Sequence, residues 1–352
     1  MQRHFASDNN AGICPEAWAA LAEANAGHAP GYGEDEWTAR AADAIRHALD
    51  SDGEVFFLFN GTAANALALA HLCEPFHSVL CQKWAHAEMD ECGAPGFFSG
   101  GAKLVLLPGA DAKIQPEDIA AAVHHGRELH APKVRALTLT QSTELGTVYS
   151  PREISAITKE ARRHGLRVHM DGARLANAVA SLGVAPSEVT WRAGVDVLTF
   201  GLTKVGSHAG EAVVFFDRAL AREFDYRCKQ AGQLASKMRF LAAPWVELLR
   251  DGAWLRHAEH ANKMAERLRV GLASMRGVKV LLPRQANAVF VDLPKAVIDA
   301  LHAAGWHFYT FIGETGCRLM CAWDTEPADV DRFLEETRRI LSHSKRKRVR
   351  SK

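Results

Sequence analysis

The sequence predicts an α/β protein in which a large domain with a mostly parallel seven-stranded sheet precedes a smaller C-terminal α+β domain. The chain of 352 residues is long enough for two domains. Its 48% hydrophobic and 24% charged residues and its formal net charge of +1 are typical of a soluble globular protein, and they exclude a disordered, collagen-like or coiled-coil chain. Amphipathic helical stretches alternate with short β-branched or aromatic runs, as expected for helices packed around a parallel sheet.

Short apolar runs in the first part of the chain are the expected strands of the large sheet. These runs are Val55–Phe59, Ser78–Cys81, Lys103–Leu107, Val134–Thr140, Arg167–Met170, Val195–Thr199 and Ala212–Phe216. The helical patterns between them are Ala63–Leu72, Pro116–His125, Pro151–His164 and Leu175–Leu182. We therefore expect residues 1–245 to form an N-terminal segment and the large domain.

The remainder of the chain has a different pattern, which predicts a small α+β domain at residues 246–342. A long amphipathic helix opens it, and strand and helix candidates alternate after that. In order these are Leu255–Met275, Val278–Leu282, Ala288–Leu293, Pro294–Ala304, Trp306–Thr310, Cys317–Cys321 and Pro327–Leu341. Six of the last eight residues are Lys or Arg, so residues 343–352 are expected to form a solvated, frayed tail, although an anionic partner is conceivable.

Composition also excludes several partners. No apolar run approaches the roughly 20 residues of a membrane helix, and the N-terminus lacks the apolar core of a signal peptide. The seven cysteines are irregularly spaced without a CxxC pair, which favours reduced thiols in the cytoplasm. Cys317 and Cys321 could bind a metal, but packing as small apolar residues is the favoured interpretation, and we expect no metal. Neither a membrane nor a nucleic acid is an expected partner.

The first candidate site follows the first expected strand, at Asn60-Gly61-Thr62. A helix begins here, and the free N–H groups and positive dipole end of a helix N-terminus bind phosphate well. Gly61 lets the backbone approach a ligand closely, and the Thr62 hydroxyl can add a hydrogen bond. The alternative is that Thr62 simply caps the helix.

The second candidate is Asp171, at the carboxyl end of the expected strand Arg167–Met170. Ligands of open α/β sheets bind at this edge, and a buried carboxylate needs a partner there. Arg174 could be that partner in a purely structural pair. Alternatively, Asp171 could face a protonated heterocyclic nitrogen.

The third candidate is Lys204, which follows the expected strand Val195–Thr199 among small and hydroxyl residues. Desolvation lowers the pKa of a lysine and frees its amine to attack aldehydes. A phosphate cradle, a strand-end Asp and this Lys occur in order along one sheet. Pyridoxal 5′-phosphate (PLP) needs these three groups as phosphate anchor, pyridinium partner and covalent attachment point.

With these residues in place, the sequence resembles the fold-type I PLP enzymes, and among them the low-specificity L-threonine aldolases of the β-eliminating lyase family. The matching stretches are Ser7-Asp8-Asn9, Tyr32-Gly33-Glu34-Asp35, Asn60-Gly61-Thr62, His86 with Glu91 and Gly93, His169-Met170-Asp171-Gly172-Ala173-Arg174, Thr203-Lys204, and Arg318-Leu319 before Trp323-Asp324. The resemblance implies PLP-dependent cleavage of L-threonine, L-allo-threonine and related L-β-hydroxy-α-amino acids, such as L-phenylserine, to glycine and an aldehyde.

The resemblance also implies roles toward the cofactor and the reaction. Lys204 would bind PLP covalently, and Asp171 would keep the pyridine nitrogen protonated. Gly61 and Thr62 would bind the phosphate. His86 would stack on the cofactor ring and act as the base for the substrate hydroxyl. Lys204, His86 and Asp171 are thus the expected catalytic residues.

A second group would bind the amino-acid substrate or complete the site. Ser7, Arg174 and Arg318 would hold the substrate carboxylate, with Arg174 close to the cofactor as well. The resemblance implies that Arg239 reaches the phosphate, sometimes across a subunit interface, and that Tyr32 approaches from a neighbouring subunit. A homodimer or homotetramer is therefore expected.

Two features leave alternatives open. Family members have an Asn-Thr-His-Asn stretch after the central strand, where this chain has Thr140-Gln141-Ser142-Thr143-Glu144, so a second active-site histidine is missing and Glu144 or Gln141 stands near its place. His86 could be an ordinary histidine, and Asp90 and Glu91 could be a solvated helix face.

Two other functions are compatible with the sequence. An aminotransferase on the same scaffold would use Lys204 to move a proton from Cα to the cofactor. A PLP-binding regulatory or scaffold protein would use the basic tail and would show salt-sensitive DNA binding without turnover.

Overall fold

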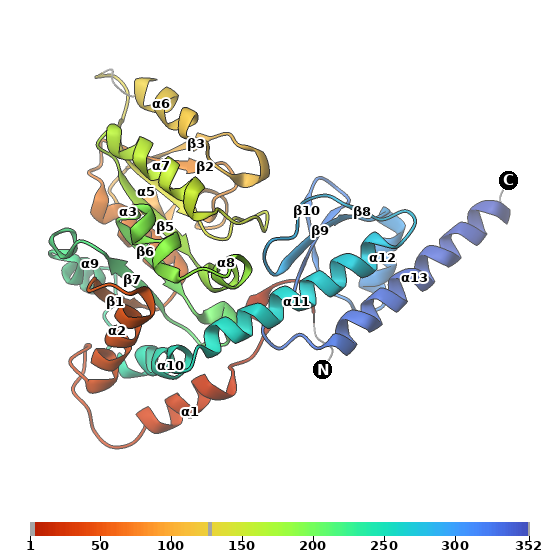
Figure 1. Cartoon of the computed structure of the whole chain (residues 1–352), viewed down its shortest axis with the longest axis horizontal. Coiled ribbons are helices and arrows are strands. Elements are labelled where there is room, and N and C mark those ends of the chain that lie inside the picture. Colours follow the sequence, from red (N-terminus) through yellow and green to blue (C-terminus); the bar gives the residue numbers. More distant parts are fainter. Residues whose placement is uncertain (1–3, 126–128, 351–352) are drawn as a thin grey trace.

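The computed structural model describes residues 4–125 and 129–350, which fold around two sheets (Figure 1). The larger sheet has seven strands in the order β1-β7-β6-β5-β4-β2-β3, and the smaller has four in the order β10-β11-β9-β8. The expected combination of a large α/β part and a smaller C-terminal α+β part is confirmed.

The large sheet contains all seven strands that the sequence predicts for the large domain. They are β1 (Glu54–Leu58), β2 (His77–Gln82), β3 (Lys103–Leu107), β4 (Lys133–Thr140), β5 (Arg167–Gly172), β6 (Val197–Gly201) and β7 (Glu211–Phe215). β7 runs antiparallel to β1 and β6, whereas β2, β3, β4, β5 and β6 pair in parallel. The start of β7 therefore lies at the same edge as the carboxyl ends of the parallel strands.

Strand alternation divides the side chains of this sheet between two cores. In β6, Leu198 and Phe200 belong to one apolar cluster and Val197 to the other, because successive residues of a strand point to opposite faces. The same rule places Asp171 on the face of Val197, since Asp171 pairs with Thr199 and lies two residues from His169, the partner of Val197. This face is the one covered by α3.

Helices cover both faces. Those with side chains in the first cluster are α1 (Pro15–Ala24), α2 (Glu36–Leu49), α6 (Pro116–His125), α7 (Pro151–Arg163), α8 (Leu175–Leu182) and α10 (Arg239–Arg250). Those in the second are α3 (Gly61–Leu72) and α9 (Phe224–Gln230), and the short helices α4 (His86–Met89) and α5 (Ala94–Phe98) follow β2. The sequence analysis did not identify α1, α2, α4, α5, α9 and α10. α10 contains Pro244, which normally indicates a helix end.

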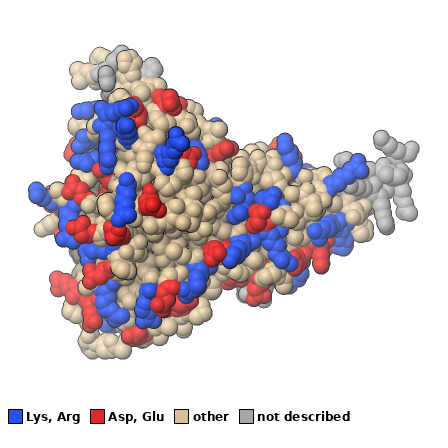
Figure 2. Space-filling model, viewed as in Figure 1, with Lys and Arg blue, Asp and Glu red and all other residues tan. Residues whose placement is uncertain are grey.

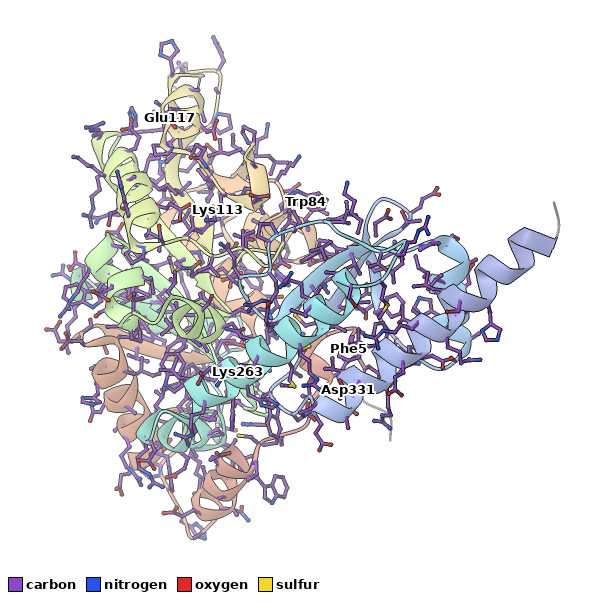
Figure 3. The ribbon with its side chains drawn as sticks, turned by 45° about the vertical axis from the view of Figure 1, so that its right-hand side comes forward. Phe5, Trp84, Lys113, Glu117, Lys263 and Asp331 are labelled. Atoms are coloured by element: carbon purple, nitrogen blue, oxygen red, sulfur yellow. The ribbon has the colours of Figure 1, made fainter. Side chains whose placement is uncertain are left out.

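The smaller sheet is antiparallel and comprises β8, β9, β10 and β11, with α12 and α13 beside it. The bounds are β8 (Lys279–Val280), β9 (Ala288–Asp292), α12 (Lys295–Ala303), β10 (Tyr309–Ile312), β11 (Gly316–Met320) and α13 (Pro327–Arg350). The strand expected at Trp306–Thr310 begins only at Tyr309, and Trp306 and Phe308 ahead of it are buried in the core of the small sheet. Phe5, from the N-terminal segment, also packs in this core, beside α13 (Figure 3).

The long helix α11 (Ala253–Ala273) connects the two parts of the molecule (Figure 1). Trp254 and Ala258 near its start lie in the core of the large sheet, whereas Leu268 and Leu272 lie in the core of the small one. The expected boundary at residue 246 falls inside α10, so the exact division between domains stays a prediction.

α13 extends beyond the helix expected at Pro327–Leu341 and continues to Arg350. The backbone of residues 343–350 is thus helical rather than frayed, which agrees with the good helix propensity of Lys and Arg. Residues 351–352 lie outside the described part of the chain. On the face shown in Figure 2, positive and negative side chains are interspersed.

Within residues 4–125 and 129–350, none of the helices has the length and apolar character needed to cross a membrane.

Candidate active site

A cavity of about 330 Å³ opens at the carboxyl edge of the large sheet. Gly61, Thr62, His86, Asp171 and Lys204 all line it, although they come from four separate segments of the chain. A volume of this size is in the range of small-ligand sites. The structure thus brings these sequence-predicted residues together at one cavity.

The first part of this cavity is the N-terminus of α3. Asn60 is the N-cap residue, and its Oδ1 accepts the Ala63 N–H at 2.9 Å. The interpretation of Thr62 as the cap is therefore wrong. By helix geometry, the N–H groups of Gly61 and Thr62 have no intrahelical acceptor, and a Cβ at Gly61 would meet nothing within 4 Å. This end of the helix has the space and the donors to bind a phosphate.

The second part is Asp171, which is buried at the end of β5. Its Oδ2 accepts a hydrogen bond from Asn65 Nδ2 at 2.9 Å, and its Oδ1 accepts the Ala173 N–H at 3.0 Å. Arg174 forms its ion pair with Asp8, so the structural Asp171–Arg174 pair is wrong.

The charge state of Asp171 follows from its surroundings. Burial would raise the pKa of Asp171, but the charges of His86 and Lys204 outweigh it and hold the pKa below its usual value. His169 lies two residues before Asp171 on the same face, and burial lowers the pKa of His169 to about 4. At neutral pH Asp171 is therefore a carboxylate, and the imidazole of His169 on the same face of β5 is neutral.

His86 is connected to Asp171 through two further side chains. His86 Nδ1 lies 2.9 Å from Glu91 Oε1, and Asn65 Nδ2 donates to Glu91 Oε1 at 2.8 Å as well as to Asp171. The hydrogen bond to Glu91 raises the pKa of His86, and burial only partly opposes this effect. Glu91 is 2% exposed, so the interpretation of Glu91 as a solvated residue is wrong, whereas Asp90 is exposed.

Lys204 belongs to a short 3-10 helix, Thr203–Val205, directly after β6. The turn ends at Gly206, which has a positive φ of 114°. A Cβ there would collide with the side chain of Cys14. Lys204 is half-buried at the edge of the cavity, where its amine and the carboxylate of Asp171 are close enough to affect the pKa of Asp171.

Arg174 is held by a bidentate ion pair with Asp8. Its Nε and Nη2 donate to the two oxygens of Asp8 at 2.7 and 2.9 Å, and both side chains are buried. Burial raises the pKa of Asp8, but Arg174 outweighs burial and the pKa falls to about 2. Ser7, immediately before Asp8, caps a short 3-10 helix by accepting the Asn9 N–H at 3.1 Å.

Arg318 lies on β11 of the small sheet and faces Glu144, with Nη1 and Oε2 3.9 Å apart. Burial lowers the pKa of Arg318, and the nearby charge of Arg174 adds to this effect. Glu144 also lines the cavity, whereas Gln141 is tied to the backbone N–H and C=O of Tyr149. Of the two residues near the missing histidine, Glu144 is therefore the one at the cavity.

Ser7, Arg174 and Arg318 are not among the residues that line the cavity of this single chain, and neither are Tyr32 and Arg239. Tyr32 is 52% exposed, and Nζ of Lys229 lies over its ring, 4.6 Å from the centroid. Arg239 begins α10 and donates from Nη1 to the Gly27 carbonyl at 3.4 Å. Their expected roles across a subunit interface stay predictions.

Cys317 and Cys321, the candidate metal ligands, are both fully buried. They belong to the apolar core of the small sheet. The interpretation of these residues as small packed side chains is confirmed.

Comparison with known proteins agrees with this geometry. Residues 4–296 match the beta-eliminating lyase family. The chain belongs to this family. It is 57% identical over 338 residues to a low specificity L-threonine aldolase of Pseudomonas aeruginosa, covering 96% of this chain and 97% of the relative. It is 55% identical over 340 residues to a low specificity L-threonine aldolase of a Pseudomonas species, covering 97% and 98%.

Solved structures show the same fold. A threonine aldolase from Leishmania major superimposes with a TM-score of 0.90 at 30% identity, and the match covers 96% of this chain and 99% of that one. A serine palmitoyltransferase from Sphingomonas wittichii has a TM-score of 0.72 at 17% identity and covers 96% and 87%. The second similarity concerns the fold alone, and it agrees with the expected fold-type I architecture.

The sequence analysis missed several residues of this site. Asn65 lies within α3, where it resembles any polar residue of an Ala-rich helix, and Asp8 was quoted only as part of a matching stretch. Glu211, at the start of β7, lines the cavity and was assigned no role. An acidic residue at the first position of an otherwise apolar strand was the only available signal.

Proposed function

We propose that the protein cleaves L-threonine, L-allo-threonine and related L-β-hydroxy-α-amino acids to glycine and an aldehyde, using PLP. The observation that carries this proposal is the convergence of Lys204, Asp171, His86 and the N-terminus of α3 on one cavity. Full-length relatives named as low specificity L-threonine aldolases support it.

The residues of the cavity fit PLP. The free helix end at Gly61 suits a phosphate, and the buried carboxylate of Asp171 suits a protonated ring nitrogen. Lys204 offers an amine for an aldehyde at the same cavity. When bound, PLP supplies an electron sink for the electrons of a bond broken at the substrate Cα.

The remaining chemistry belongs to the side chains. Arg174 and Arg318 orient the substrate carboxylate, and this orientation decides which bond at Cα breaks. His86 accepts the proton of the β-hydroxyl, and its position is maintained by Glu91. The hydrogen bond to Glu91 raises the pKa of His86 above its usual value, which makes the imidazole a stronger proton acceptor.

We also propose that the protein is a homodimer or homotetramer that acts in the cytoplasm. Tyr32 and Arg239 lie outside the cavity of their own chain, and Tyr32 is exposed, which makes it accessible to a second copy. Free cysteines at all seven positions are compatible with a reducing compartment.

A panel of amino acids tests the activity. The PLP-loaded protein is incubated with L-threonine, L-allo-threonine and L-phenylserine, and aldehyde and glycine are measured in parallel. We expect equal amounts of both products, loss of aldehyde release in Lys204→Ala, and a fall of roughly 10²–10⁴-fold in His86→Ala. Formation of a keto acid with pyridoxamine phosphate would instead identify an aminotransferase.

A further inference from the structure

Glu211 is a buried carboxyl group in the cavity to which no role has been assigned. It is the first residue of β7, 7% exposed, and it pairs with Gly201 in β6. A Cβ on Gly201 would collide with Oε2 of Glu211 and approach the Ala173 Cα at 3.0 Å. The carboxyl group therefore lies over Gly201, at the carboxyl edge of the sheet, and lines the same cavity as Lys204.

One oxygen of this carboxyl group is unsatisfied. Oε2 of Glu211 is buried and has no hydrogen-bond partner among the residues that the structure describes. Burial of a carboxylate is costly, and a buried carboxyl group that keeps an unsatisfied oxygen stays protonated to a higher pH than an exposed one. Glu211 is thus an available proton donor rather than a structural ion pair.

The titratable and polar groups near Glu211 belong to three segments of the chain that line the cavity. Burial raises the pKa of Glu211 to about 8, and the charge of Lys204 and a hydrogen bond from the Thr203 hydroxyl limit the increase. The negative charge of Asp171, on β5, raises it further. His208, in the loop before β7, also lines the cavity, and burial lowers the pKa of His208.

We infer that Glu211 is a positioning residue that acts through Lys204, by holding the proton that the lysine amine must lose before it can attack an aldehyde. When the amine is released, the carboxyl group of Glu211 gives its proton to Nζ of Lys204, which leaves a carboxylate beside an ammonium. Before the amine attacks again, the proton returns from Nζ to the carboxylate. The N–H and O–H bonds exchange one proton, and no oxidant or further reactant is required.

This inference rests on the proposed function only in requiring that PLP binds to Lys204. It does not depend on which bond of the substrate breaks. The pH dependence of the visible absorbance of the PLP-loaded protein reports the protonation of the nitrogen of Lys204, without any turnover.

The test compares wild type with Glu211→Gln, which has nearly the same shape but cannot titrate. Once Glu211 has given up its proton, its carboxylate favours the protonated form of the nearby nitrogen, so its removal should lower the pKa of the chromophore by about one unit or more. The rate at which glycine displaces Lys204, followed by rapid-mixing absorbance, should fall about tenfold. Glu88→Gln, at an exposed position of α4, is the matched control and should change neither quantity.

Glu211→Asp provides a second comparison if Glu211→Gln does not fold. The shorter side chain still titrates but lies farther from Lys204, so we expect a smaller shift of the chromophore pKa in the same direction. A chromophore pKa within about 0.3 unit of wild type in the folded variants would overturn the inference.

Other outcomes separate this inference from the proposed function. If the chromophore pKa falls as expected in Glu211→Gln but the wild-type protein releases no aldehyde, only the proposed function is overturned. A wild-type protein that never becomes coloured with PLP would overturn both.

Discussion

Buried side chains at the carboxyl edge of the large sheet are charged or polar, whereas those in the core of the small sheet are apolar. Asp8, Arg174 and Asp171 are buried at the first location, where each has hydrogen-bond partners. Phe5 and Phe333 are buried at the second, where their ring centroids lie 5.1 Å apart. Burial of apolar surface stabilises a fold directly, but a buried charge is stable only while its partner is present.

This difference leads to different consequences of mutation. A substitution in the apolar core should reduce stability and leave the chemistry of the site unchanged. A substitution at the charged edge should reduce both, because the same partners that neutralise a charge also orient the cavity side chains. The following predictions test this contrast, from the largest expected effect to the smallest.

The largest effect is expected for Asp8→Ala. It leaves the guanidinium of Arg174 buried without a carboxylate, which should reduce the free energy of unfolding by about 3–5 kcal/mol. Because Arg174 is also proposed to bind the substrate, threonine cleavage should be lost as well. Urea unfolding and aldehyde release, measured on the PLP-loaded protein at pH 7, check both effects. A loss of stability below about 1 kcal/mol would contradict the importance of this pair.

Phe5→Ala should reduce the free energy of unfolding by about 3–5 kcal/mol, because Phe5 is 1% exposed and packs against Trp306 and Phe333. At a temperature where the variant is folded, its kcat should stay near that of wild type. Phe76→Ala, at a residue that is 63% exposed, is the matched control and should change stability by less than about 0.5 kcal/mol. If kcat falls in proportion to stability, the proposed separation of the two regions is wrong.

The Asp8–Arg174 pair should also make stability depend on pH. The pKa of Asp8 falls from 3.8 to about 2 on folding, so its contribution is complete above pH 4 and disappears as the pH falls toward 2. The corresponding loss is about 2 kcal/mol. The difference in unfolding free energy between wild type and Asp8→Asn should therefore shrink between pH 4 and pH 2. A difference that stays constant over this interval would exclude Asp8 as the titrating group.

A smaller effect is expected for Glu91→Gln, which removes the charge that raises the pKa of His86. Since His86 is a base only above its pKa, the acid limb of the kcat/KM profile should move to lower pH. The plateau should fall about tenfold, because a hydrogen bond to a charged group is lost. Measurement of kcat/KM across pH checks both changes, and Glu88→Gln should reproduce the wild-type profile. An unmoved acid limb would show that His86 is not the group that titrates.

Much of this arrangement could be predicted from the sequence. All the strands of the large sheet are found within about two residues of the expected positions, and the residues flanking them meet at one cavity. The reason is local: apolar runs determine strands, and the carboxyl ends of parallel strands share an edge. The missed helices α1 and α2 are rich in alanine, so their apolar faces are less evident.

The hydrogen bonds and ion pairs between the buried side chains of the site could not be predicted in this way. Asp8 and Arg174 are 166 residues apart, and Asn65 and Asp171 are 106 apart. No local pattern specifies such pairs, and the sequence favoured a pairing of Asp171 with Arg174 as strongly as the role that the structure supports. The same holds for Glu91, which is adjacent to an exposed Asp90 but is itself buried.

The sequence by itself determined the positions of the strands along the chain, the residues at their ends and the family to which the chain is similar. Only the tertiary structure decided which buried titratable groups are paired and which, like Glu211, keep an unsatisfied oxygen. The physical reason is that periodicity depends on neighbours along the chain, whereas the charge state of a buried group depends on every element that packs around it.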